Sequence, residues 1–205
     1  MEMLKKLDED TLIDAVGYGK MVQKLSVYND KLYRDALTGA YNRRYYEDEI
    51  KHVKGKAGVV ILDVDDFKLY NQLYGVKEGD LCLQRIAGII KSSVGDSGYT
   101  ARYGGKEFAV LLPRYDLFSA RNLVESISKQ IFVMNNRRTD MKLKAITVSA
   151  GISAAPYAAK NVKELMENVD LAVYHVKHSG KNGIQVFDTM FRNNKNENTT
   201  NREHI

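Results

Sequence analysis

The stretch YTARYGGKEFAVLL, residues 99–112, consists of two short apolar and aromatic runs joined at Gly104 and Gly105. Paired glycines between runs that favour β-structure predict a tight hairpin, because glycine reaches positive φ without the steric penalty of a Cβ atom. Lys106 and Glu107 follow the turn directly. A turn without side chains lets a ligand approach the backbone, and the charges beside it suit a phosphate or a metal ion. An ordinary hairpin with solvated charges is the alternative.

The continuous apolar run VVIL at 59–62 predicts a strand that is buried on both faces. Asp63, Asp65 and Asp66 follow at its carboxyl end, where α/β sheets usually bind their ligands. Each aspartate could instead cap the next helix. Three carboxylates in four positions repel one another unless a cation or hydrogen bonds offset the repulsion, which favours a functional role.

Helical and extended patterns alternate along the rest of the chain. We expect helices at 42–50, 67–75, 80–91, 116–135 and 161–180, and strands at 142–153 and 184–187. Asp80 is expected to cap the third of these helices, and Asn161 with Glu164 forms a capping-box pattern. Strands that are first separated by helices and then paired in a hairpin predict an α+β sandwich, with a central, mostly antiparallel sheet flanked by helices.

The chain divides into one domain and two flanking segments. Apolar residues at amphipathic spacing predict a helical stalk or linker at 1–34, which Gly17 and Gly19 interrupt. The domain is expected at 35–190. The polar residues 191–205 are expected to form a disordered tail.

Composition narrows the class of protein. Hydrophobic residues make up 44% of the 205 residues and charged residues 28%, as in soluble globular proteins. The net charge of +5 is modest, and we expect no nucleic-acid partner. No apolar run approaches the roughly 18 residues of a membrane span, so a cytoplasmic location is the default expectation. The single Cys82 lies on an apolar helical face and is expected to be a buried structural thiol.

Several stretches follow one another along the chain in a recognisable order. They are DALTGAYNRR at 35–44, DVDDFKLYNQLYGVKEGD at 63–80, RYGGKEF at 102–108, TVSAGIS at 147–153 and DLAVYHVKHSGKN at 170–182. Together they resemble the motifs of the diguanylate cyclase family, whose domain is named for its GGDEF signature. The resemblance covers roughly residues 33–188 in the right order and spacing.

The resemblance implies a fold like the palm of nucleotidyl cyclases and polymerases. In that family two domains face each other, each holding one GTP, so we expect a homodimer or a heterodimer with an active relative. The 3′-hydroxyl of each GTP attacks the α-phosphate of the other, which releases pyrophosphate and gives cyclic di-GMP. Such phosphoryl transfer depends on positioning and on Mg²⁺ ions that neutralise the phosphates.

The matched motifs also imply roles for individual residues. Asp63 is implied as a metal ligand through its carboxylate, and Val64 through its backbone carbonyl. Contacts to the guanine edge are implied for Asn71 and Asp80, contacts to the triphosphate for Lys68, Lys177 and Lys181, and close approach of the nucleotide to the turn for Gly104 and Gly105. Without the resemblance, the two lysines near a helix end could merely complement the helix dipole, and Asn71 could be a turn residue.

Lys106 departs from the family pattern, because active members carry Asp or Glu there as a metal ligand beside the attacking hydroxyl. The replacement changes the local charge by two units, and a cation about 4 Å from Mg²⁺ is repelled by on the order of several kcal/mol per unit charge at an effective dielectric of roughly 20. We expect weakened metal binding and lost or strongly reduced catalysis, with Lys106 pairing with Asp63 or partly replacing the cation at the phosphates. Glu107 remains as an acidic group for a shifted metal position.

Three functions are consistent with this pattern. The favoured one is a degenerate GGDEF domain that binds GTP or a related guanine nucleotide for signalling. The second is an active diguanylate cyclase that condenses two GTP molecules as a homodimer, and Lys106 argues against it. The third is a dimerising scaffold without nucleotide, and the intact pair of guanine-contacting residues argues against it.

Overall fold

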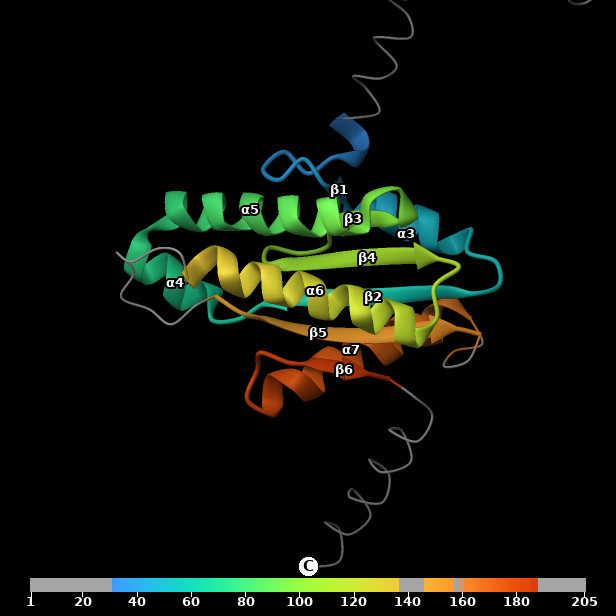
Figure 1. Cartoon of the computed structure of the whole chain (residues 1–205). Helices are drawn as coiled ribbons and strands as arrows, with labels where there is room; N and C mark the ends of the chain where they lie inside the picture. Colours follow the sequence, from blue (N-terminus) through green and yellow to red (C-terminus); the bar gives the residue numbers. More distant parts are fainter. Residues whose placement is uncertain (1–30, 137–145, 157–158, 160, 188–205) are drawn as a thin grey trace, which may run out of the picture.

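The computed structural model describes residues 31–136, 146–156, 159 and 161–187 (Figure 1). Most of the predicted N-terminal stalk and all of the predicted C-terminal tail lie outside these residues. Within them, six strands form one sheet in the order β1-β3-β4-β2-β5-β6. The strands are β1 (Tyr41–Asn42), β2 (Ala57–Val64), β3 (Tyr99–Arg102), β4 (Glu107–Pro113), β5 (Val148–Ala155) and β6 (Ile184–Val186).

The strands pair mostly in antiparallel register, as predicted. β4 lies between β3 and β2, and β2 lies between β4 and β5, all antiparallel. The short outer strands β1 and β6 pair in parallel with β3 and β5. All eight residues of β2 are buried, which explains the continuous apolar run in its sequence. β5 begins at Val148, whereas a strand was predicted from 142, and residues 142–145 lie outside the described part of the chain.

Helices cover both faces of the sheet (Figure 1). α5 (Val76–Val94) and α6 (Leu117–Asn136) pack on one face, and α3 (Arg43–Lys51) and α7 (Val162–His178) pack on the other. α4 (Phe67–Tyr74) follows β2 directly, and the short 3₁₀ helix η1 (Gly95–Ser97) links α5 to β3. Because successive residues of a strand point to opposite faces, Val60 joins the core under α5 and α6, whereas Ile61 joins the core under α7.

The apolar helix faces that the sequence predicted are buried. Asn161 caps α7, because its side-chain oxygen accepts a hydrogen bond from the backbone N–H of Glu164 at 2.9 Å. The inward residues of this helix are Leu165, Val169, Ala172, Val173 and Val176, as predicted. Cys82 on α5 is buried and is therefore the structural thiol that its helical face indicated.

Two local predictions were wrong. α5 begins at Val76 rather than at Asp80, because Gly75, with a φ of 85°, ends α4 and lets the chain turn at once into the next helix. Asp80 therefore lies inside α5 and does not cap it. Neither Gly104 nor Gly105 has a positive φ, so the turn between β3 and β4 does not depend on the conformational freedom of glycine. A Cβ added at Gly104 would lie 2.4 Å from Oε2 of Glu107, the end of a flexible side chain that can shift.

Candidate functional site

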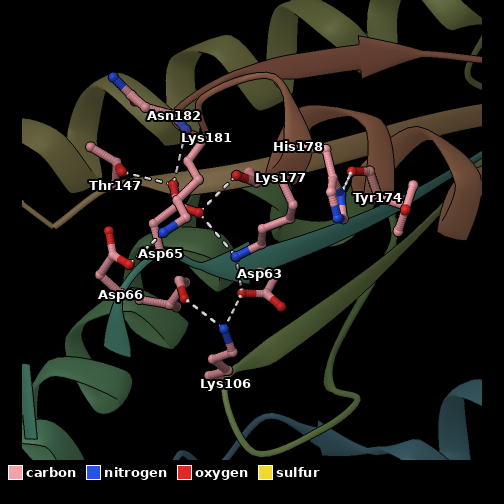
Figure 2. Close-up of polar contacts among 12 residues, drawn as sticks. Asp63, Asp65, Asp66, Lys106, Thr147, Tyr174, Lys177, His178, Lys181 and Asn182 are labelled. Carbon is pink, nitrogen blue, oxygen red and sulfur yellow. Dashed lines mark hydrogen bonds and ion pairs between the residues drawn. The ribbon is translucent and has the colours of Figure 1, made fainter. Parts of the chain in front are cut away.

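Three distant segments of the chain meet at the carboxyl end of β2 (Figure 2). The end of β2 and the turn after it supply Asp63, Val64, Asp65 and Asp66, the turn before β4 supplies Lys106, and the end of α7 with the following loop supplies Lys177, Lys181 and Asn182. The antiparallel register of β2 with β4 and β5 brings these segments together. The sheet, rather than any local motif, therefore builds the site.

Asp65 is buried, and both oxygens of its carboxylate are in use. They accept hydrogen bonds from Ser149 Oγ at 2.7 Å, Thr147 Oγ1 at 2.7 Å, Lys177 Nζ at 2.9 Å and the backbone N–H of Asn182 at 3.0 Å. Burial acts to raise the pKa of Asp65, but these hydrogen bonds, with that from Ser149 the strongest, hold the pKa below its ordinary value. Asp65 thus joins β2 to β5 and to the loop after α7, which makes it a structural carboxylate.

Lys177, in the last turn of α7, lies between two of the aspartates. Its Nζ is 2.5 Å from Asp63 Oδ1 and 2.9 Å from Asp65 Oδ1, and its side chain is only 18% exposed. Burial acts to lower the pKa of Lys177, but the hydrogen bonds to the two carboxylates raise the pKa above its ordinary value. A cation at this end of a helix also interacts favourably with the helix dipole, whereas contact of Lys177 with a triphosphate stays a prediction.

Lys106 reaches the same carboxylate from the turn before β4. Its Nζ is 2.9 Å from Asp63 Oδ1 and 3.4 Å from the backbone carbonyl oxygen of Val64. Figure 2 shows its side chain extending from that turn up to Asp63. The expected pairing of Lys106 with Asp63 is therefore confirmed. The two oxygen atoms that it contacts are the ones that the resemblance implied as metal ligands.

A magnesium ion does not fit the residues present. Three carboxylates face three ammonium groups in ion pairs, namely Asp63, Asp65 and Asp66 with Lys106, Lys177 and Lys181, so the cluster carries no net charge. A carboxylate at position 106 would leave two negative charges in excess, which suits a divalent cation. With Lys106 present, Mg²⁺ about 4 Å from the ammonium group would be repelled by about 8 kcal/mol at an effective dielectric of roughly 20, before further screening by salt. In the described ranges, no group of three or more His, Cys, Asp or Glu side chains is arranged to hold a metal ion.

Asp66 turns the chain from β2 into α4. It occupies the N-cap position with a φ of 50°, in the left-handed region that is unfavourable for residues other than glycine. Its side chain makes no capping hydrogen bond and instead forms an ion pair with Lys181 at 2.5 Å. The side chains of both partners are exposed, so this ion pair is weak and open to exchange with a ligand.

A cavity of about 590 Å³ opens beside these lysines. Its lining includes Lys68, Asn71, Lys106, Lys177 and Lys181, all of which were predicted as site residues, together with Asp66. Four of the charged residues in this lining are lysines and one is an aspartate. Asp63 and Asp65, which pair with Lys106 and Lys177, are nearly buried, so the cavity surface is more positive than the neutral cluster as a whole and favours an anionic ligand.

Asn71 presents an unused acceptor at the wall of the cavity. Its Oδ1 is buried and has no hydrogen-bond partner within the described residues. The oxygen lies against Gly79, where an added Cβ would come within 1.8 Å of it, so the close approach requires glycine. A buried acceptor without a partner costs about 1–3 kcal/mol.

Six predicted site residues are not in the lining of this cavity. Asp63 and Val64 lie beside it in contact with Lys106, and the other four are Asp80, Gly104, Gly105 and Glu107. Glu107 is directly opposite Asp63 in the register of β2 with β4, and its carboxylate lies against Gly104. The nucleotide and metal contacts that the resemblance implied stay predictions for all of the site residues, including those that line the cavity.

Sequence analysis missed the two hydroxyl groups that hold Asp65. Thr147 and Ser149 occupy alternate positions at the start of the stretch TVSAGIS, which is otherwise apolar or small. Polar side chains at alternate positions next to a buried strand were the available signal. Their partner lies 82 and 84 residues earlier in the chain, so only the sheet register identifies it.

Comparison with known proteins identifies the family. The family described as diguanylate cyclase, GGDEF domain, matches residues 32–183. The chain therefore belongs to the GGDEF domain family of diguanylate cyclases. No helix within the described residues has the length and apolar character needed to cross a bilayer.

Curated relatives are longer than this chain. Diguanylate cyclase VdcA of Vibrio cholerae is 31% identical over 167 residues, which cover 79% of this chain and 49% of the relative. Diguanylate cyclase A of Treponema denticola is 32% identical over 69% of this chain and 37% of the relative. The Bacillus subtilis protein YtrP is 32% identical over 76% of this chain and 26% of its own length. The chain thus spans between a quarter and a half of these proteins.

Solved structures with the same fold include two that cover most of this chain. The coiled coil and GGDEF domain of DgcB from Caulobacter crescentus, in complex with c-di-GMP, has a TM-score of 0.75 at 25% identity and covers 91% of this chain and 100% of its own. Diguanylate cyclase SiaD from Pseudomonas aeruginosa, in complex with its activator SiaC, has a TM-score of 0.73 at 25% identity over 90% of this chain and 73% of its own. The predicted α+β fold is therefore confirmed.

Proposed function

We propose that this domain binds GTP or a related guanine nucleotide for cyclic di-GMP signalling, and that it makes cyclic di-GMP weakly or not at all. One observation carries the proposal. The ammonium group of Lys106 lies between Asp63 Oδ1 and the carbonyl oxygen of Val64, beside a cavity whose charged residues are mostly lysines. The site therefore keeps groups that suit a nucleotide and loses an acidic group that synthesis needs.

The phosphates of the nucleotide are assigned to the lysines. The side chains of Lys106 and Lys181 are 41% and 40% exposed, and both line the cavity together with Lys68. Lysine binds phosphate as a compact point charge. A phosphate can replace Asp66 as the partner of Lys181, because an exposed ion pair of this kind contributes little.

The guanine base is assigned to Asn71 and Asp80. The buried, unpartnered Oδ1 of Asn71 suits an N–H donor on the base. A carboxylate at position 80 suits the adjacent N1–H and N2–H donors of guanine, which adenine lacks. A site built on such hydrogen bonds discriminates strongly against a ligand that leaves its buried polar groups unpaired.

Impaired synthesis follows from the charge at position 106. Attack by a 3′-hydroxyl on a phosphate requires removal of the hydroxyl proton and neutralisation of the phosphate charge. A charged lysine cannot accept the proton. It also repels the divalent cation that would otherwise lie next to Asp63, as described above. Several relatives are named diguanylate cyclases, which supports the guanine nucleotide as ligand but leaves the activity of this chain to be measured.

Two assays on the purified protein test the proposal. Incubation with GTP and excess Mg²⁺ or Mn²⁺, followed by chromatography, measures pyrophosphate and cyclic di-GMP. Calorimetric titration measures the binding of GTP and ATP. We expect GTP to bind at least about tenfold more tightly than ATP, and product to stay at the level of a control without enzyme.

The same assays identify the alternatives. Abundant product that disappears in the Asp63→Ala variant would establish an active cyclase and contradict the proposal, whereas a trace of product would not. Failure to bind any nucleotide would leave the dimerising scaffold. A homodimer, a heterodimer with an active relative and a cytoplasmic location stay predictions, and sedimentation of the protein with and without GTP tests the first of them.

A further inference from the structure

We infer that Lys106 is a covalently tethered cation, so that the domain binds the polyphosphate of its nucleotide without a divalent metal ion. The inference rests on the proposed function, because it concerns how the same cavity holds a guanine nucleotide. The reason for the inference is that the family uses a metal ion, whereas the residues of this chain do not fit one.

The ammonium group of Lys106 occupies a ready-made site between two oxygen atoms. Asp63 Oδ1 at 2.9 Å and the carbonyl oxygen of Val64 at 3.4 Å are the hard oxygen ligands that a cation such as magnesium prefers. An ammonium group has three N–H donors. Two of them face the protein oxygens, and the third can reach a phosphate oxygen in the cavity that Lys106 lines.

Neighbouring contacts hold this cation in position before a ligand arrives. Asp63 Oδ1 also accepts a hydrogen bond from Lys177 at 2.5 Å, and Lys177 in turn contacts Asp65 at 2.9 Å. The hydroxyl groups of Thr147 and Ser149 fix Asp65 from β5 and the residue before it. A chain of contacts therefore runs from the buried sheet to the cavity. A site that is ordered in advance loses little entropy when its ligand binds.

The charges around the cavity match a nucleotide that carries no metal. Four lysines and one aspartate are among the residues that line it. A free triphosphate bears more negative charge than its magnesium complex, so it gains more from these lysines. The magnesium complex also brings a divalent cation close to Lys106, which repels it. Removing magnesium should therefore strengthen binding, which is the reverse of the behaviour of a metal-dependent nucleotide site.

Calorimetric titration of the whole chain with GTP, in EDTA and in excess MgCl₂, tests the inference. We expect the wild type to bind GTP at least about tenfold more tightly in EDTA. Lys106→Met keeps the length of the side chain and removes its charge, and we expect it to lose about tenfold or more in affinity in EDTA. Lys163→Met removes a charge from an α7 lysine that is 87% exposed, and we expect it to bind as the wild type does.

The variant Lys106→Asp should reverse the metal dependence and bind GTP more tightly in MgCl₂ than in EDTA. Binding of the wild type in MgCl₂ alone, or unchanged affinity of Lys106→Met in EDTA, would overturn the inference and leave the proposed function standing. No binding in either condition would overturn the proposed function itself. Thermal unfolding shows whether each variant is folded, and if a variant is not, the comparison of the wild type in the two conditions decides alone.

Discussion

At the scale of single residues, the oxygen Asp63 Oδ1 accepts from two ammonium groups, Lys177 at 2.5 Å and Lys106 at 2.9 Å. These two lysines differ in their surroundings. Lys177 is 18% exposed and also contacts Asp65, whereas Lys106 is 41% exposed and contacts Asp63 alone among the aspartates of the site. A buried ion pair whose partner is removed leaves an uncompensated charge, but an exposed one leaves its partner to water. The two lysines should therefore contribute differently to stability and to binding.

Lys177→Met is expected to lower the free energy of unfolding by about 3 kcal/mol, because it leaves Asp65 buried with one ionic partner fewer. Lys106→Met is expected to change the free energy of unfolding by less than about 1 kcal/mol, since its ammonium group is partly solvated. Urea unfolding of both variants at pH 7 measures the difference. Equal losses in the two variants would show that Lys106 also serves mainly to hold the fold.

Asp65→Asn is expected to destabilise the fold at neutral pH and to lose this effect in acid. The pKa of Asp65 is lower in the folded protein than its ordinary value of 3.8, so the charged carboxylate stabilises the fold above that value. The contribution disappears as the pH falls below about 4, through the folded pKa. Urea unfolding from pH 7 to pH 3 should show that the free energies of unfolding of the wild type and the variant approach each other as the pH falls. A constant difference across that range would argue against a hydrogen-bonded, ionised Asp65.

At the scale of elements, α7 lies very close to β5, and this closeness sets the position of Lys177. A Cβ added at Gly151 of β5 would lie 2.5 Å from the backbone oxygen of Val169 and 2.8 Å from the backbone nitrogen of Val173. Both of these atoms belong to the helix backbone and cannot move aside like a flexible side chain. Glycine in β5 therefore fixes the distance between helix and sheet.

Gly151→Ala is expected to lower the free energy of unfolding by about 1–3 kcal/mol, because the added methyl group pushes α7 away from the sheet. The displacement should also move Lys177 and weaken GTP binding. Gly88→Ala on α5 is the matched control, since an added Cβ there meets nothing within 4 Å. Alanine in a helix interior should raise the free energy of unfolding by about 0.5–1 kcal/mol. Thermal unfolding tests whether Gly151→Ala lowers the stability of the domain and Gly88→Ala raises it.

The sequence predicted elements better than it predicted their ends. The apolar run at 59–62 and the spacing of α6 and α7 gave correct types, because burial imposes a regular period on the side chains. The start of α5 was misplaced, since Asp80 has the character of a cap, whereas Gly75, predicted only as the end of the preceding helix, also holds the N-cap position of α5 without a capping side chain. The positive φ expected for Gly104 and Gly105 was also wrong. A glycine pair indicates a turn, but it does not reveal whether the turn needs a positive φ.

The candidate site was predicted in part. Its lysines and aspartates could be named from matched motifs, and the pairing of Lys106 with Asp63 follows from opposite charges on neighbouring positions. The contacts of Asp65 with Thr147 and Ser149 could not be predicted, since they depend on the register of β2 with β5. A one-residue slip in that register would send the side chains to the opposite face of the sheet.

At the scale of the whole molecule, the charged groups of the site are drawn from distant parts of the chain and held by one folded unit. GTP binding should therefore stabilise the entire domain. In EDTA, GTP at about 100 times its dissociation constant should add about 2.7 kcal/mol to the free energy of unfolding. For a chain of this size the melting temperature should rise by roughly 5–10 °C. Thermal unfolding with GTP measures the shift.

Salt provides the control for this prediction. Binding that depends on several lysines should weaken as the ionic strength rises from about 0.05 to about 0.5 M, because the Debye length shortens and the charges are screened more strongly. The shift in melting temperature caused by GTP should shrink accordingly. A shift that does not depend on salt would indicate that the base, rather than the phosphates, supplies most of the affinity.

The ammonium group between Asp63 and Val64 also has a genetic consequence. Each lysine codon becomes a glutamate codon through a change of one base. A GGDEF domain with glutamate in its signature and a domain like this one are thus separated by a single mutational step, and the partial exposure of position 106 lets the fold tolerate either residue. On the proposed function, a single substitution therefore connects an enzyme of this family with a receptor for its substrate, without an unfolded intermediate.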